Sequence, residues 1–232
     1  MNRPLAARAA SAIAVITTPF VIVFVAVLFF LNPIWVGFDQ DRSDVTGLTG
    51  YTHSQVQMVT GSILSDLVFG PPNFDVSADG THTGTPVLDE RARSHMKDVR
   101  SVLLELGLVA MIAGLLLAGV GFYSRGRRWF WLAVRTGARV LIVGVVVVGA
   151  AFAVFFEQAF ELFHEIFFPP GTYMFDPATD KLVQLFPDQF WSETSVALAA
   201  TVLLLAIVVA VVADRLCREP TGATADLPPA VS

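Results

Sequence analysis

The chain has 232 residues, of which 54% are hydrophobic and only 15% are charged. A soluble domain carries about 25% charged residues, so this composition excludes an ordinary soluble protein and indicates an integral membrane protein. The formal net charge of −5 comes mostly from the polar segments between the apolar runs, and it gives no sign of a nucleic-acid partner.

Four apolar runs are each long enough to cross a hydrocarbon core, which takes about 20 helical residues. They cover residues 10–31, 102–123, 140–160 and 196–213. The apolar core of the first run exceeds the roughly 7–15 residues of a signal peptide, and no A-x-A cleavage pattern follows it. We therefore predict that it is retained as a helix. Thr194 or Ser195 is the expected N-cap of the fourth helix.

The orientation follows from the arginines near the helix ends. The segment between the second and third runs, SRGRRWFWLAVRTGAR, has five arginines and no acidic residue, so we predict that it faces the cytoplasm. Arginines before the first run and after the fourth agree, which places both termini inside. Residues 32–98 and 163–193 then face outside. With its aromatic residues, the basic segment is interpreted as an anchor on anionic lipid, and a phosphate-ligand site is the less favoured alternative.

These spans predict a single four-helix membrane domain over residues 1–218 and a disordered cytoplasmic tail at residues 219–232. The one cysteine, Cys217, lies on the predicted inner side, so no disulfide is expected in the outer segments.

The first outer segment begins with Asn32-Pro33, which should end the first helix and open a turn-rich exit. SQVQMVTGSILSDLVFG follows, with apolar residues at spacings of three and four that predict a short amphipathic helix. Gly70-Pro71-Pro72 should break it, and residues 74–87 should form a loop or short strand with a turn at Asp79-Gly80.

The second outer segment contains TYMF and KLVQLF on either side of DPATD, a pattern that predicts a hairpin laid over the helix ends. The predicted fold class is therefore an all-α membrane protein. It has four transmembrane helices, a short amphipathic helix and small hairpin or loop elements on the extracytoplasmic side.

Two helices bring a histidine and a carboxylate to the outer interface. His95 and Asp98 lie in the first turns of the second membrane helix, and Glu161 and His164 lie where the third emerges through FFEQAFELFHEIFF. Ionisable residues within membrane helices are functional-site candidates by default. The structural alternative is that the glutamates of this stretch pair with Lys97 and Arg100.

Two chemistries fit such a pair of histidines. A zinc ion held by His95, His164 and one carboxylate is the first, although the match to a di-metal bundle site is weak. The second is acid–base catalysis without metal. One imidazole takes a proton from the nucleophile, and a second, protonated histidine or a basic group stabilises an oxyanion. Asp98 or Glu161 would then orient a ring. The chain has no G-x-S-x-G elbow and no P-loop, which disfavours a covalent serine mechanism.

The motifs SHMKDVR, LFHEIFF and TYMFDPATDKLVQLFPDQFW resemble those of the bacterial lipoprotein intramolecular transacylase (Lit) family, which are four-helix integral membrane proteins. The resemblance implies transfer of the sn-2 acyl chain of a lipoprotein's S-diacylglyceryl group to the α-amine of its N-terminal cysteine. The product is an N-acyl lyso-lipoprotein. The resemblance also implies that His95 and His164 are the functional histidines and that the protein lies in the bacterial cell membrane.

If the protein is a transacylase, physical reasoning assigns roles to the other polar residues near the two histidines. Asp98 and Glu161 are candidate orienting groups, and Arg100 and Tyr173 are candidates for stabilising the oxyanion. The partners are the diacylated lipoprotein N-terminus and membrane lipid, with no obligatory protein partner. No cofactor is required, because converting an ester to an amide is downhill. The competing functions are a non-catalytic membrane sensor or assembly protein and a metal-dependent membrane hydrolase.

Overall fold

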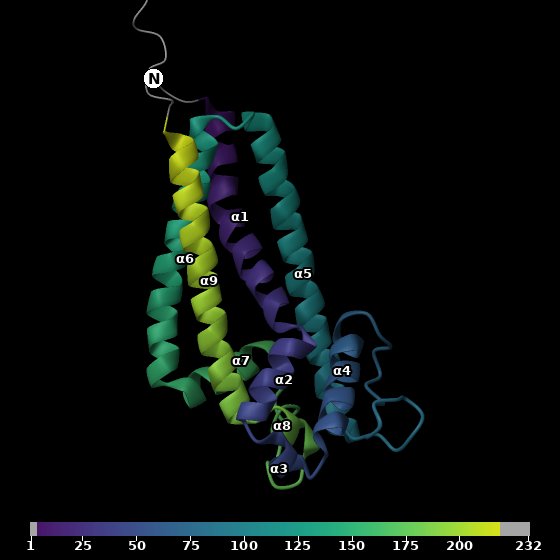
Figure 1. Cartoon of the computed structure of the whole chain (residues 1–232). Coiled ribbons are helices and arrows are strands. Elements are labelled where there is room, and N and C mark those ends of the chain that lie inside the picture. The colour runs from purple at the N-terminus through teal and green to yellow at the C-terminus, as the bar shows by residue number, and fades with distance from the viewer. Residues whose placement is uncertain (1–3, 219–232) are drawn as a thin grey trace, which may run out of the picture.

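The computed structural model describes residues 4–218, which fold into nine α-helices and no strand. The predicted all-α fold class is confirmed. Four of the helices within this range are long and apolar enough to cross a membrane: α1 (Leu5–Phe30), α5 (Glu90–Ser124), α6 (Arg128–Val154) and α9 (Asp188–Cys217). They run alongside one another as a bundle (Figure 1). The predicted tail at residues 219–232 lies outside the described residues.

Small side chains allow the membrane helices to pack closely. Ala14 and Ala26 of α1, Ala138 of α6 and Ala206 of α9 are fully buried. A Cβ atom at Gly137 of α6 would lie 2.6 Å from the carbonyl oxygen of Val15, so only glycine fits there. Close approach of this kind is how helices associate in lipid, where no hydrophobic force drives them together.

Two membrane helices extend further than hydropathy predicts. α6 begins at Arg128 rather than at residue 140 because the alanines and valines of its inner face pack against α1 and α9. α5 begins at Glu90 rather than near residue 102. Its 35 residues correspond to about 52 Å, against a hydrocarbon core of about 30 Å. The polar first turns of α5 therefore project beyond the apolar part of the helix.

The projecting end of α5 packs against short helices at one end of the bundle (Figure 1). These are α2 (Pro33–Arg42), α3 (Val45–Thr49), α4 (His53–Val68) and α8 (Lys181–Leu185). They enclose a second hydrophobic core, the outer core, whose largest fully buried side chains are Ile63, Phe74, Leu88 and Leu185. A cap of short helices, the outer cap, thus covers this end of the membrane helices.

The predicted amphipathic helix is confirmed as α4. A capping box between Thr52 and Gln55 starts it, and the predicted apolar face, including Val59 and Ile63, is buried. Beyond α4, the turn at Asp79-Gly80 is also confirmed, because Gly80 has a φ of +77° and donates to the carbonyl of Ser77.

Two predictions for the outer segments are wrong. The turn-rich exit after Asn32 is the helix α2, because the Asn32 side chain accepts from the amides of Ile34 and Trp35 while Pro33 occupies the first helical position. The hairpin at residues 173–186 is absent from the described chain, where the helix α8 replaces its second strand. Leu182 and Leu185 are both buried in the outer core, and this spacing of three residues suits a helix.

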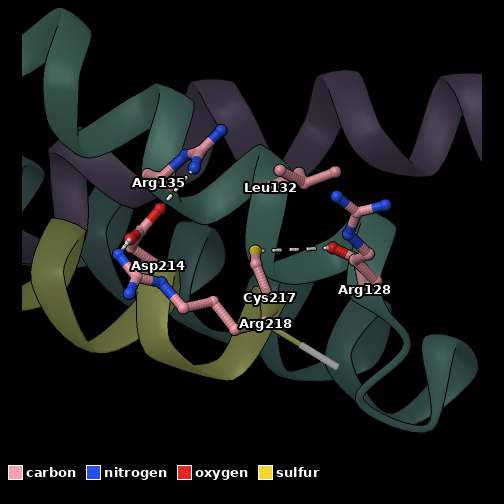
Figure 2. A pocket seen from close by; sticks show the side chains of 6 residues that line it. All are labelled: Arg128, Leu132, Arg135, Asp214, Cys217 and Arg218. Carbon is pink, nitrogen blue, oxygen red and sulfur yellow. Dashed lines mark hydrogen bonds and ion pairs between the residues drawn. The ribbon is translucent and has the colours of Figure 1, made fainter. Parts of the chain in front are cut away.

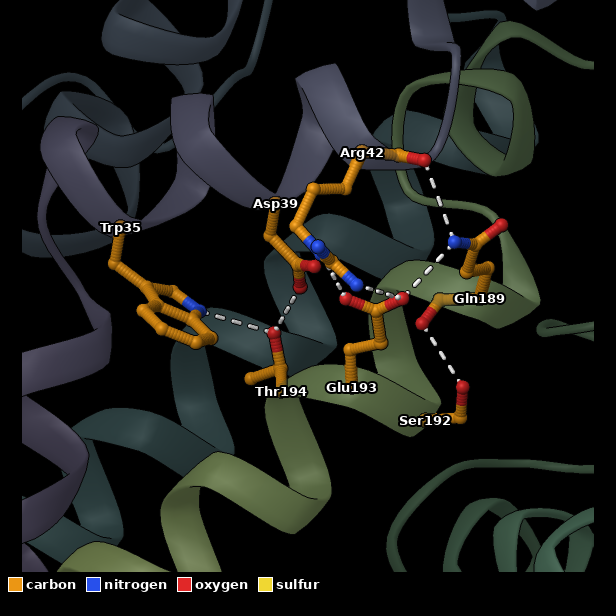
Figure 3. A network of polar contacts seen from close by, with 7 residues as sticks. All are labelled: Trp35, Asp39, Arg42, Gln189, Ser192, Glu193 and Thr194. Carbon is orange, nitrogen blue, oxygen red and sulfur yellow. Dashed lines mark hydrogen bonds and ion pairs between the residues drawn. The ribbon is translucent and has the colours of Figure 1, made fainter.

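The expected N-cap of the fourth membrane helix is also wrong, because α9 begins at Asp188. Thr194 instead lies within α9 and donates to the buried carboxylate of Asp39 on α2 at 2.7 Å, while Trp35 donates to the threonine (Figure 3). Arg42 and Glu193 form an ion pair beside them. These contacts extend α9 past its apolar run and attach it to α2.

Candidate active site

The stretch FFEQAFELFHEIFF does not continue the third membrane helix as predicted. α6 ends at Val154, the backbone leaves the helical conformation at Phe155, and the chain resumes as α7 (Phe156–Phe167). This helix lies at the same end of the bundle as α2 and α8 (Figure 1). The break allows His164 to approach the bundle while the three glutamates of α7 remain exposed.

The structure brings His95 of α5 and His164 of α7 together. Their ring centroids are 5.9 Å apart and the ring planes are inclined by only 24°, so the two imidazoles stack. His95 is buried, with 6% of its surface exposed, whereas His164 is half-buried. A substrate can therefore reach the pair from the side of His164.

Aromatic side chains surround both imidazoles. Phe168 contacts both rings, at centroid distances of 4.7 Å from His95 and 5.4 Å from His164. Phe175 also packs on His95. Phe160 and Tyr173 pack on His164, with ring centroids 4.3 and 5.2 Å from that of the imidazole. We call these four residues the aromatic cradle.

Sequence reasoning interpreted the phenylalanines as lipid contacts and packing, and it did not assign Phe160, Phe168 or Phe175 to the site. The spacing of Phe160, His164 and Phe168 by four residues was the available signal, because such residues share one helical face.

A backbone group orients His164. Its Nδ1 lies 2.8 Å from the carbonyl oxygen of Phe160, one turn earlier in α7. A carbonyl oxygen can only accept, so Nδ1 carries the proton of this bond and the neutral ring keeps its lone pair on Nε2. The Nδ1 of His95 is buried and has no hydrogen-bond partner among residues 4–218.

The proposed orienting carboxylates do not make the expected contacts. Asp98 is half-buried and Glu161 is exposed, and within the described chain neither forms a hydrogen bond or ion pair with an imidazole. The carbonyl of Phe160 occupies the position that a carboxylate would need beside His164. Within residues 4–218, no three His, Cys, Asp or Glu side chains gather in a group able to hold a metal ion.

Arg100 is engaged away from the histidines. Its guanidinium donates to the carbonyl oxygens of Asp66 and Gly70, and thereby caps the end of α4. Neither Arg100 nor Lys97 forms an ion pair with Glu157 or Glu161 in the described structure, so the simple pairing alternative for these acids is wrong. Tyr173, in contrast, lies directly beside His164.

Next to the Arg100 contact, the side chain of Asp66 is buried and neither carboxylate oxygen has a hydrogen-bond partner among the described residues. Burial raises the pKa of Asp66. The nearby side chains of His82, whose Nε2 lies 3.5 Å from Oδ1 of Asp66, and of Arg100 lower this pKa. The folded protein therefore holds this proton more tightly than the unfolded chain, whose aspartates have a pKa of about 3.9. Protonated Asp66 favours the folded state, and this contribution is lost as the pH rises through the raised pKa.

We expect Asp66→Asn to unfold at a higher temperature than the wild type at pH 7, because the neutral amide avoids burying a charge. The difference should shrink as the pH falls toward 4. Thermal unfolding in detergent across this range measures it, with the exposed Asp41→Asn as the control. A variant that is less stable at pH 7, or a difference that grows on acidification, would contradict this interpretation.

Comparisons with known proteins agree with this fold. The model of the family described as lipoprotein intramolecular transacylase Lit matches residues 12–191. An uncharacterized protein from Aquifex aeolicus strain VF5 is 26% identical over 127 residues, which make up 54% of this chain and 56% of that protein. The chain thus spans little more than half of the length of this relative.

Solved structures give the same picture. The membrane integral lipoprotein intramolecular transacylase Lit from Bacillus cereus superposes with a TM-score of 0.77 at 20% identity, covering 90% of this chain and 95% of that one. A variant of the same protein with one histidine replaced by arginine gives a TM-score of 0.72 at 19% identity, covering 90% and 91% of the two chains. At this identity the likeness shows the fold, and it supports a multi-pass membrane protein. Because the family model matches more than half of the residues, the chain belongs to the lipoprotein intramolecular transacylase Lit family.

Proposed function

We propose that this protein moves the sn-2 acyl chain of a diacylated lipoprotein to the α-amine of the lipoprotein's N-terminal cysteine, giving an N-acyl lyso-lipoprotein. The observation that carries the proposal is the stacked pair of His95 and His164 within the aromatic cradle, in a chain of this family. The reaction needs a base and an oxyanion donor next to an apolar surface, and the pair offers these groups in that setting.

The first requirement is to remove a proton from the amine. An α-amino group has a pKa of about 7.7–8.0, so near neutral pH most of it is protonated and unreactive. We assign this role to His164, because the Phe160 carbonyl holds its proton on Nδ1 and leaves the lone pair of Nε2 free. Donor ester and acceptor amine belong to one molecule, so positioning supplies much of the acceleration.

The second requirement is to stabilise the oxyanion. The proton that His164 takes from the ammonium form passes to solvent before the attack. As the neutral amine nitrogen then attacks the ester carbonyl, a second proton passes from the nitrogen to Nε2 of His164 and negative charge develops on the carbonyl oxygen. We assign donation to this oxygen to an N–H of His95, with Tyr173 as a second candidate donor. The carbon–oxygen bond to glycerol then breaks, and His164 returns the proton to the leaving oxygen. No redox equivalent or nucleotide is consumed.

The remaining predicted residues have smaller roles in this proposal. Arg100 binds the end of α4 and thereby stabilises the outer cap. Asp98 and Glu161 contribute negative electrostatic potential near the histidines. The aromatic cradle provides an apolar surface against which acyl chains can lie while the headgroup meets the imidazoles.

We also propose that the site faces outside and that both termini are cytoplasmic. The arginine-rich connection between α5 and α6 lies at the end of the bundle opposite to α7 and α8 (Figure 1). The positive-inside rule places that connection in the cytoplasm. Lipoproteins carry their lipid on the other surface, where the histidines would lie.

Expression with a reporter lipoprotein in a bacterium without this activity tests the function. Intramolecular transfer conserves mass, so the parent ion of the N-terminal lipopeptide is uninformative. Fragmentation should show an amide-linked acyl chain on cysteine and one remaining ester, and mild alkali should release only the ester-linked chain. An unchanged diacylglyceryl group would contradict the proposal, and loss of one acyl mass would indicate a hydrolase instead.

A further inference from the structure

A cleft lies between α6 and α9 (Figure 2), at the end of the bundle opposite to α7, the helix that carries His164 (Figure 1). Its volume is about 280 Å³. Six residues line it: Arg128, Leu132, Arg135, Asp214, Cys217 and Arg218. Figure 2 shows that the two α6 arginines lie on either side of Leu132, opposite the three residues from α9. The transacylation site makes no use of this cleft.

The charges in the cleft do not balance. Asp214 accepts from Arg135 at 2.5 Å and from Arg218 at 2.9 Å, so one carboxylate serves two guanidinium groups. The third guanidinium, on Arg128, has no ion pair or hydrogen bond within residues 4–218. Three positive charges therefore face one negative charge, and the cleft has a surplus of two.

One buried donor in the cleft also lacks an acceptor. The Nε of Arg135 is inaccessible to solvent and has no hydrogen-bond partner in the described structure. A buried guanidinium N–H without an acceptor costs free energy. An anionic ligand on the exposed part of the Arg135 side chain would offset part of this cost through its charge. Guanidinium groups match the oxygen geometry of phosphate particularly well, because two parallel N–H donors meet two oxygens.

The position of the cleft favours the phosphate of a lipid headgroup over free phosphate. It lies at the N-terminal end of α6 and the C-terminal end of α9, two membrane-crossing helices. Leu216, the neighbour of Cys217 in the chain, is half exposed on α9, and Trp129 follows Arg128 at a membrane-interface position. A phosphate held here would sit where lipid headgroups lie, with apolar residues beside it for the acyl chains.

We propose that the cleft between α6 and α9 binds the phosphate group of an anionic phospholipid of the adjoining leaflet. Bound lipid would neutralise the surplus charge and hold the ends of α6 and α9 together. This makes the arginine-rich segment a defined binding site in addition to a general electrostatic anchor.

Native mass spectrometry of the purified full chain tests the proposal with three probes: phosphatidylglycerol, diacylglycerol and inorganic phosphate. Phosphatidylglycerol should remain bound, whereas diacylglycerol, which has the same tails and no phosphate, should not. Arg128→Gln should weaken phosphatidylglycerol binding about tenfold, because it removes one charge-assisted contact. The Arg128 side chain is exposed and makes no hydrogen bond or ion pair in the described structure, so we expect this change to leave folding intact.

Arg127→Gln is the matched control. It removes the same charge from the preceding residue, which is exposed and does not line the cleft, so its effect should be less than twofold. Equal weakening by the two substitutions, or equal binding of diacylglycerol, would overturn the proposed site. Displacement of the lipid by millimolar inorganic phosphate would support recognition of the phosphate itself but would overturn the assignment to lipid alone.

Discussion

Replacing His164 with alanine is expected to slow transacylation about a thousandfold, the middle of the range for loss of a general base. The imidazole is held by the Phe160 carbonyl with Nε2 free, whereas the other imidazole in the aromatic cradle, that of His95, is buried. The measurement is the rate of amide formation on a synthetic diacylated lipopeptide by the purified variant in detergent.

The pH dependence distinguishes a base from a merely structural residue. Without His164 the reaction depends on amine that has already lost its proton to solvent. With an amine pKa of about 8, the neutral fraction rises about tenfold between pH 7 and 9. The residual rate of His164→Ala should rise by this factor, after subtraction of the reaction without protein, and the gap to the wild type should narrow.

His53 provides a control for the general effect of replacing a histidine with alanine. His53 lies at the start of α4, where it is exposed and contacts Asp41 and Gln57 instead of the imidazole pair. His53→Ala should keep a rate close to that of the wild type. Wild-type activity in a folded His164→Ala variant would remove His164 from the mechanism.

Replacing His95 with alanine is expected to lower the rate by about two to three orders of magnitude at every pH tested. In our proposal His95 donates to the developing oxyanion, and raising the pH does not replace a missing donor. The absence of pH rescue therefore separates this variant from His164→Ala. The assay is the same lipopeptide reaction, followed from pH 7 to 9.

His95→Gln refines the test, because the amide keeps an N–H donor and a similar length. It should recover part of the rate lost in His95→Ala. Since the two imidazoles act on one transition state, the double variant should be little slower than either single variant. Losses that multiply, together with pH rescue of His95→Ala, would show that the assigned roles are wrong. Because His95 is buried, its replacement also removes packing. Thermal unfolding of each variant therefore checks that the variant is still folded.

The burial of His95 next to the outer core connects stability and function. Met96, the next residue, belongs to that core, and Phe175 packs both on the core and on the imidazole. The same packing that fixes α8 and the polar start of α5 therefore positions one of the two catalytic candidates. The short helices at this end of the bundle thus set the geometry of the candidate site.

The sequence by itself determined the membrane class, the presence of four membrane-length helices and the amphipathic helix α4. These features depend on hydropathy and periodicity over one helix, so they can be read without knowledge of the rest of the chain. The position of His95 in the polar first turns of a membrane helix followed from the same kind of local pattern. Composition and spacing were sufficient because a bilayer imposes one requirement on every segment that crosses it.

Tertiary structure alone decided how these segments meet. The break at Phe155, the helical α8 and the attachment of Thr194 to Asp39 all depend on partners distant in sequence, which no local pattern contains. Contacts of the same kind give His164 a backbone carbonyl as its partner and turn Arg100 toward α4. Each side chain adopts the partner that packing leaves within reach, and that choice is made only when the helices come together.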